Sequence, residues 1–173
     1  VAGETLERLG PGSHAGAWEP HINQFKLMAI VGGTTMSVPV DFCILFLQKS
    51  RQKIPLFLGV EPSKAKGTWI PANREPFGVV VKQHESHAEI CFQEKSENES
   101  NRKFDEINRC QEEIEFKYGG KLRWERLPEK KRSKIMTHPI PLGYKDIKNW
   151  NSLIAQLTDD AAIFFEVISE KIY

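Results

Sequence analysis

The sequence has little of what marks several large classes of protein. Its 173 residues include only three cysteines, Cys43, Cys91 and Cys110, and none of them lies in a Cys-x-x-Cys pair. Three separate cysteines cannot build a disulfide framework. Each lies within an apolar pattern, so we expect all three to be small buried side chains.

Long apolar runs are also missing. The longest near the N-terminus, residues 27–31, is far too short to span a bilayer. Glu4, Glu7 and Arg8 interrupt the start of the chain, which therefore does not resemble a secretory signal. We expect a soluble, cytoplasmic protein with no membrane partner.

A strong net charge is absent as well, because 24 basic and 23 acidic residues leave a formal charge of +1. This excludes a globally basic nucleic-acid binder. The distribution is uneven, however: residues 85–115 are mainly acidic, whereas residues 121–134 are mainly basic. Such asymmetry either steers an anionic partner to one edge or produces two solvated faces that partly neutralise each other.

The positions of glycine and proline divide the chain into two parts. Half of the 12 glycines fall in the first 33 residues, around the loop-like residues 11–16. Residues 1–38 therefore form an N-terminal arm or partial element, and residues 39–173 form the better-patterned domain.

The apolar periodicity of residues 39–173 predicts an α+β fold. Helical spacing is expected over residues 39–53, 100–118 and from 146 to the end. Strands are expected around Trp69, at residues 77–82 and 88–93 as a hairpin, and at 122–127 and 135–140. The predicted architecture is a mainly antiparallel sheet of four to five strands packed with three helices.

This order of helix, three strands, helix and strand resembles the restriction-endonuclease-like nucleases. Those enzymes hold Mg²⁺ with an acid on one strand and Glu-x-Lys or Gln-x-Lys on the next, where the lysine helps to activate water. Here the matching run is Gln93-Glu94-Lys95, and Glu89 is the only other strand acid available. The catalytic candidates are therefore Glu89, Gln93 and Lys95, although a solvated strand end is the favoured interpretation.

A zinc site would draw on His84, His87 and Cys91, which are zinc-ligand types. A structural zinc needs four ligands, and no second cluster has suitable spacing, so we favour a polar hairpin turn. We predict no metal and no cofactor, with Mg²⁺ required only by the nuclease alternative.

The segment that most suggests binding follows Gly119-Gly120. Trp124 lies among bases, a mixture that suits phosphate contacts together with stacking on an unpaired base. The competing interpretation places Trp124 in the core beside a basic turn. The candidate bases are Arg126, Lys130, Lys131 and Arg132.

The run Glu113-Ile114-Glu115, Gly119, Leu122 and Trp124-Glu125-Arg126-Leu127, followed by Trp150, resembles family 4268 of the domains of unknown function. The likeness covers about residues 40–173 and implies a prokaryotic cytosolic protein in a restriction, repair or phage-defence setting. The residues carried over are Glu115, Trp124, Glu125, Arg126 and Arg132. They form either a polar site or a structural ion-pair network.

We therefore expect a non-catalytic module that contacts DNA or RNA, or that binds a nuclease or defence partner. The first alternative is a degenerate Mg²⁺-dependent nuclease. The second is a homo-oligomerisation module built on the last helix.

Overall fold

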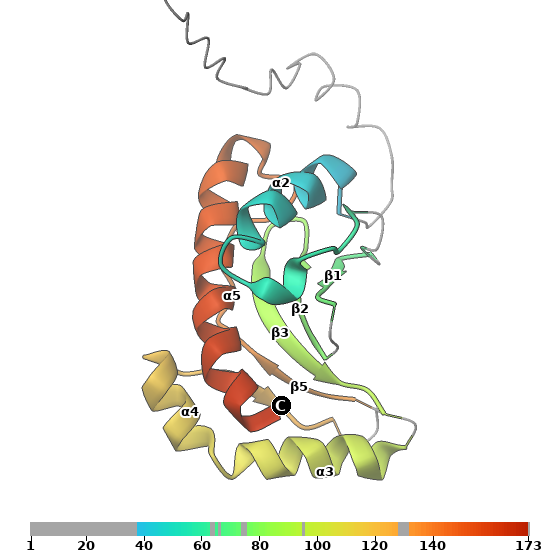
Figure 1. Cartoon of the computed structure of the whole chain (residues 1–173), viewed down its shortest axis with the longest axis vertical. Helices are drawn as coiled ribbons and strands as arrows, with labels where there is room; N and C mark the ends of the chain where they lie inside the picture. The colour runs from blue at the N-terminus through green and yellow to red at the C-terminus, as the bar shows by residue number, and fades with distance from the viewer. Residues whose placement is uncertain are drawn as a thin grey trace, which may run out of the picture. The chain divides into compact units, whose positions relative to one another are not determined.

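Five short strands form one antiparallel sheet in the computed structural model, which describes residues 38–62, 65, 67–73, 76–94, 96–127 and 132–172 (Figure 1). The order across the sheet is β1-β2-β3-β5-β4, so the last strand along the chain lies between the third and the fourth. The strands are β1 (Trp69–Pro71), β2 (Phe77–Val81), β3 (Ser86–Phe92), β4 (Arg123–Glu125) and β5 (Ser133–Met136).

The helices of the described residues pack on one side of this sheet. Helix α5 runs beside the strands in Figure 1 and contacts β3, α2 and α4, while α3 contacts β3 and β5. Their bounds are α2 (Val40–Ser50), α3 (Glu97–Asn108), α4 (Gln111–Tyr118) and α5 (Trp150–Ile172), with 3-10 turns at Pro55–Phe57 and Ile147–Asn149. The predicted α+β class and the antiparallel sheet are confirmed.

The β2–β3 hairpin follows the alternation of its sequence. Phe77 pairs with Ile90 and Val79 pairs with Ala88, and all four side chains are buried against the helices. Because successive side chains of a strand point to opposite faces, the intervening residues point away from the helices. The predicted hairpin is confirmed together with its two faces.

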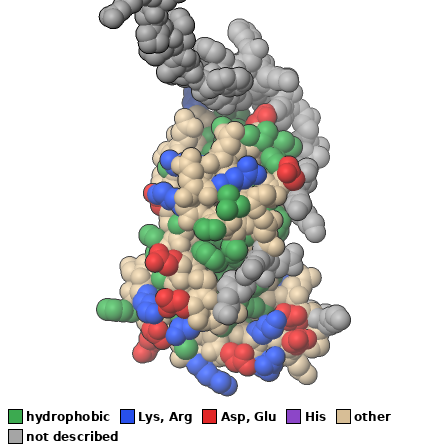
Figure 2. Space-filling model, viewed as in Figure 1, with side chains coloured by type: hydrophobic (Ala, Val, Ile, Leu, Met, Phe, Trp, Pro, Cys, Tyr) green, Lys and Arg blue, Asp and Glu red, His purple; other side chains and the backbone are tan. Residues whose placement is uncertain are grey.

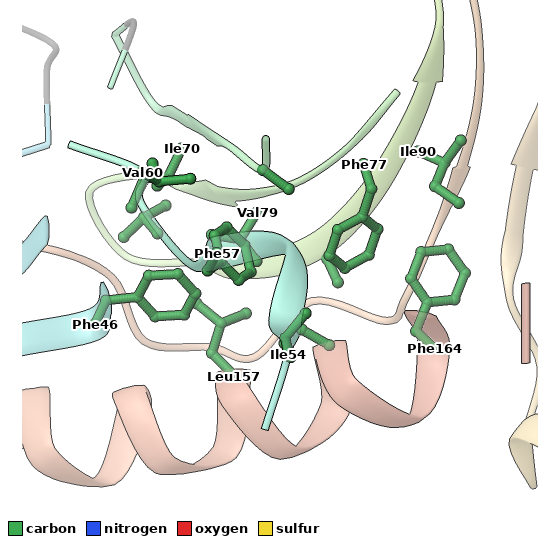
Figure 3. Close-up of a cluster of buried hydrophobic side chains, with 14 of the residues drawn as sticks. Phe46, Ile54, Phe57, Val60, Ile70, Phe77, Val79, Ile90, Leu157 and Phe164 are labelled. Atoms are coloured by element: carbon green, nitrogen blue, oxygen red, sulfur yellow. The ribbon is translucent and has the colours of Figure 1, made fainter. Parts of the chain in front are cut away.

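The core lies between the sheet and α5. The Phe57 ring contacts those of Phe46 and Phe77, and Phe77 also contacts Phe164 of α5 (Figure 3). Burying one such side chain stabilises the fold by roughly 1.5–3 kcal/mol. The apolar stripe of α5 is buried in this core, and a homo-oligomer built on the last helix stays a prediction. The stripe comprises Leu153, Leu157, Ala161, Phe164 and Ile168.

One predicted element is wrong in its extent. The helix expected over residues 100–118 is two helices, α3 and α4, which are separated at Arg109 and Cys110. Cys110 has φ −99° and ψ 15°, which interrupts the helical hydrogen-bond ladder. The break lets α3 follow the sheet while α4 turns toward α5. A single straight helix could not bury both apolar stripes.

Several predictions lie beyond the description of the structure. Residues 1–37 are outside the described residues, so the division of the chain near residue 38 stays a prediction. The likeness to restriction-endonuclease-like nucleases also stays a prediction. Within the described ranges, no helix is long and apolar enough to cross a membrane.

Gly78 of β2 provides the first test of this packing. A Cβ at this position would lie 2.5 Å from Cζ2 of Trp69 and 2.7 Å from the Ile70 carbonyl oxygen. We expect Gly78→Ala to lower the free energy of unfolding by about 1–3 kcal/mol, because the backbone on one side cannot yield. Urea denaturation measures the change. Gly120→Ala is the control, since its new Cβ would approach no heavy atom closer than 3.7 Å. Equal stability of the two variants would contradict the packing.

Candidate functional site

A depression of about 640 Å³ lies on the face of the sheet that points away from the helices. All five strands and the segments that flank them line it, and most of the lining is polar or charged. The charged and aromatic lining residues are Trp69, Lys82, His87, Glu89, Arg123, Glu125, Arg132 and Lys134. We call this surface the open face.

Strand register places these side chains in rows. Glu89 of β3 lies opposite Met136 of β5, which in turn lies opposite Arg123 of β4. The next row along the strands runs from Cys91 through Lys134 to Glu125. Because β5 lies between β3 and β4, Lys134 becomes a diagonal neighbour of Glu89.

Glu89 forms the charged centre of the open face. Its side chain is only 4% exposed, and Nζ of Lys134 lies 2.8 Å from both of its carboxylate oxygens. Nε2 of His87 lies 3.4 Å from Oε2. Burial raises the pKa of the Glu89 carboxyl, but hydrogen bonds from His87 and Lys134 and the charge of Lys134 hold it below its usual range. Glu89 is therefore a buried, ionised carboxylate.

Basic side chains outnumber acidic ones around Glu89. Arg123 pairs with Glu125 across 2.9 Å, and Lys82 pairs with Glu85 at the end of the hairpin. Arg132 forms no ion pair with any carboxylate of the described residues. The lining thus holds four basic side chains against two acidic ones.

The sequence-predicted residues Trp124 and Glu115 lie on the other side of the sheet. The Trp124 ring contacts Phe104 of α3 with a centroid distance of 6.1 Å, and its Nε1 donates to Glu115 at 3.1 Å. Glu115 also accepts hydrogen bonds from Gln111, Lys121 and the backbone N–H of Leu122.

These four donors define the electrostatics of Glu115, which is only 5% exposed. Burial raises the pKa of its carboxyl, but the hydrogen bonds outweigh this effect and bring the pKa to about 2. The carboxylate thereby joins the end of α4 to the start of β4, which is a structural task.

Arg126 also points toward the helices. Its Nε and Nη2 lie 2.9 and 3.2 Å from the two carboxylate oxygens of Asp105 in α3. Together with the contacts of Lys121 to Glu115 and of Lys134 to Glu89, this pair connects the basic segment to the acidic one. Figure 2 shows cationic and anionic side chains intermixed on the visible face at the α3–α4 end.

The structure thus divides the sequence-predicted set. Glu89, Gln93, Glu125 and Arg132 meet at the open face, whereas Glu115, Trp124 and Arg126 face the helices. Lys95, Lys130 and Lys131 lie outside the described residues.

Sequence reasoning missed four side chains of this lining as site residues: Trp69, Lys82, Arg123 and Lys134. Lys82 directly follows β2, and the alternation of that strand could have predicted that Lys82 points away from the helices. Trp69 belongs to a strand of three residues that ends at Pro71, which is too short for any alternation to be read.

The cysteines differ from the prediction that all three are buried. Cys43 is buried, and burial raises the pKa of its thiol to about 11, so it stays protonated at neutral pH. Cys91 and Cys110 are only half-buried, because Cys91 points to the open face and Cys110 lies at the break between α3 and α4. Among the described residues, no group of three or more His, Cys, Asp or Glu side chains is placed to hold a metal ion.

Comparison with known proteins gives one match. Residues 40–172 match the model of the family described as Domain of unknown function (DUF4268), and the chain belongs to that family. No curated protein and no solved structure matches the chain.

The hydrogen bonds that Glu115 accepts from α4 and from the start of β4, here called the Glu115 clamp, lead to a pH-dependent prediction. Its carboxyl pKa is about 2 in the folded chain, below the ordinary value of 4.5. The stabilisation is therefore complete above the higher of these two values and is lost as the pH falls toward the lower one. We expect Glu115→Gln to cost about 2 kcal/mol at neutral pH, with a difference from the wild type that shrinks in acid. Urea denaturation at several pH values measures this. Glu112→Gln, an exposed change in the same helix, serves as the control. A difference independent of pH would refute the clamp.

Proposed function

We propose that this DUF4268 domain contacts nucleic acid through the open face of its sheet. The supporting observation is the excess of Lys and Arg around a depression that no helix of the described residues covers. Phosphate oxygens of the backbone would approach Arg123, Arg132 and Lys134, with Lys82 at the hairpin end.

The physical basis is the exchange of weak ion pairs for phosphate contacts. Arg123 is 43% exposed and its partner Glu125 is 37% exposed, and ion pairs of this kind contribute little stability in water. Binding of a nucleic acid offsets the free energy lost with these ion pairs, because each neutralised phosphate releases condensed counterions. Arg132 can contact a phosphate without first breaking an ion pair, since it forms none with the carboxylates of the described residues.

This proposal moves the binding surface away from Trp124 and Arg126, which the sequence had favoured. Trp124 donates its indole N–H to Glu115, and Arg126 pairs with Asp105 on the helix-facing side, away from the depression. The open face instead combines Arg123, Arg132 and Lys134 from the same basic segment. A restriction, repair or phage-defence setting and a cytoplasmic location rest on the family resemblance and stay predictions.

A second candidate function, a Mg²⁺-dependent nuclease, draws on Glu89 and Gln93, which line the same depression. Mg²⁺ requires several oxygen ligands, whereas both oxygens of Glu89 contact Lys134. Incubation of supercoiled plasmid with Mg²⁺ or Mn²⁺ decides between the two functions. Nicking that Glu89→Gln abolishes would establish the nuclease, and we expect no nicking.

Two arginines that point to opposite sides of the sheet test the binding surface, one in the edge strand β4 and one directly after it. Arg123 and Arg126 are 43% and 47% exposed, and each pairs with one carboxylate. We expect Arg123→Ala to weaken binding and to reduce the slope of log affinity against log salt by about 0.7 for single strands or 0.9 for duplex DNA. Arg126→Ala removes the same charge but should leave the slope unchanged.

Fluorescence anisotropy of a labelled oligonucleotide across a salt series provides the measurement, with Arg132→Ala as a second open-face variant. Binding that does not respond to salt, or that weakens equally in Arg123→Ala and Arg126→Ala, would remove the open face as the binding surface.

A further inference from the structure

We infer that the open face carries a subsite for one unpaired nucleobase, formed by Trp69, Val80 and His87. This inference rests on the proposed function and narrows its ligand to single-stranded nucleic acid. Its parts are an aromatic platform, an apolar floor and a buried polar atom without a partner.

The platform is the indole of Trp69. Its Cζ2 and Cη2 atoms lie 2.5 and 2.7 Å from the place where a Cβ of Gly78 would be, so the ring lies against bare backbone of the neighbouring strand. The side chain is half-buried and lines the depression. An aromatic ring held in this way offers a surface on which a base can stack, whatever its sequence.

The floor and the polar atom follow from strand register. Trp69 of β1 lies opposite Val80 of β2, and Val80 lies opposite His87 of β3. Neighbouring strands are about 4.8 Å apart, so the backbones at Trp69 and His87 are separated by roughly 10 Å. Val80 is almost completely buried between them and forms the floor.

His87 is 96% buried, since only 4% of its surface is exposed, yet its Nδ1 has no hydrogen-bond partner within the described part of the chain. Nε2 faces the ionised Glu89, which can only accept, so the ring proton is placed on Nε2 and the lone pair on Nδ1. A buried polar atom left in this state is unfavourable. A base edge carries hydrogen-bond donors, so it can donate to the lone pair of Nδ1.

The surrounding charges favour a strand over a free base. Arg123 lies in the row of Glu89 and Lys134 lies in the row of Cys91, which are the next two rows along the strands from His87 on the same face. A base at Trp69 would therefore have its backbone near cations. In a duplex the base faces are stacked on each other, and only an unpaired base can turn onto Trp69. A single strand is therefore the ligand that can contact both the base subsite at Trp69 and the basic side chains of the open face.

The experiment compares oligothymidylate with a fully abasic strand of the same length, which carries the same phosphates but no bases. We expect the wild-type chain to bind oligothymidylate about 5- to 100-fold more tightly than the abasic strand. Trp69→Ala should remove that ratio and leave abasic binding unchanged, whereas Trp69→Phe should retain most of it. His87→Ala should lower the ratio in the same direction as Trp69→Ala.

Trp124→Phe, on the helix-facing side, is the matched control and should keep the wild-type ratio. Quenching of tryptophan fluorescence by oligothymidylate should be present in the wild type and lost in Trp69→Phe, a readout that holds even if Trp69→Ala fails to fold. Equal binding of the two strands by the wild type would overturn the base subsite and leave the proposed phosphate contacts standing. Binding of neither strand would overturn both.

Discussion

The alternation of side chains along each strand decides where every charged group of the sheet lies. Side chains such as Val79, Ile90 and Ile135 point to the helices and are buried, while Glu89 and Lys134 point the other way. Within the described residues the helices cover only the first face. Polar groups on the second face are therefore satisfied by one another, by water where they are exposed, or by a ligand, and the most buried of them must find partners within the fold.

Glu89 shows how the constraint is met. A buried carboxylate without partners would be protonated or would destabilise the fold, because desolvation penalises its charge. Lys134 contacts both oxygens and His87 approaches one of them, so the charge is retained in the folded chain. The cost of this arrangement appears at His87, whose Nδ1 is left without a partner among the described residues. The contacts that keep Glu89 ionised thus use Nε2 of His87 and leave its Nδ1 without a hydrogen bond to any described residue.

The opposite side of β4 is tied down just as firmly. Glu115 accepts hydrogen bonds from Trp124 and from the backbone of Leu122, which together with the pairing of β4 to β5 hold Trp124 on the helix-facing side. Arg123 and Glu125 are thereby directed to the open face. Trp124 therefore has a structural role, which agrees with the core interpretation of the sequence.

A periodicity within one segment was enough to predict the α+β class, the hairpin with its two faces and the approximate positions of the helices. The basic segment could also be found in this way, but not the side of the sheet to which each base points. The folded chain was needed to show that β5 lies between β3 and β4, that the long helix breaks at Cys110 and that Trp69 lines the depression. The physical reason is that a local pattern specifies which face of an element is buried, whereas the neighbour of that element depends on contacts between distant segments, which no local periodicity records.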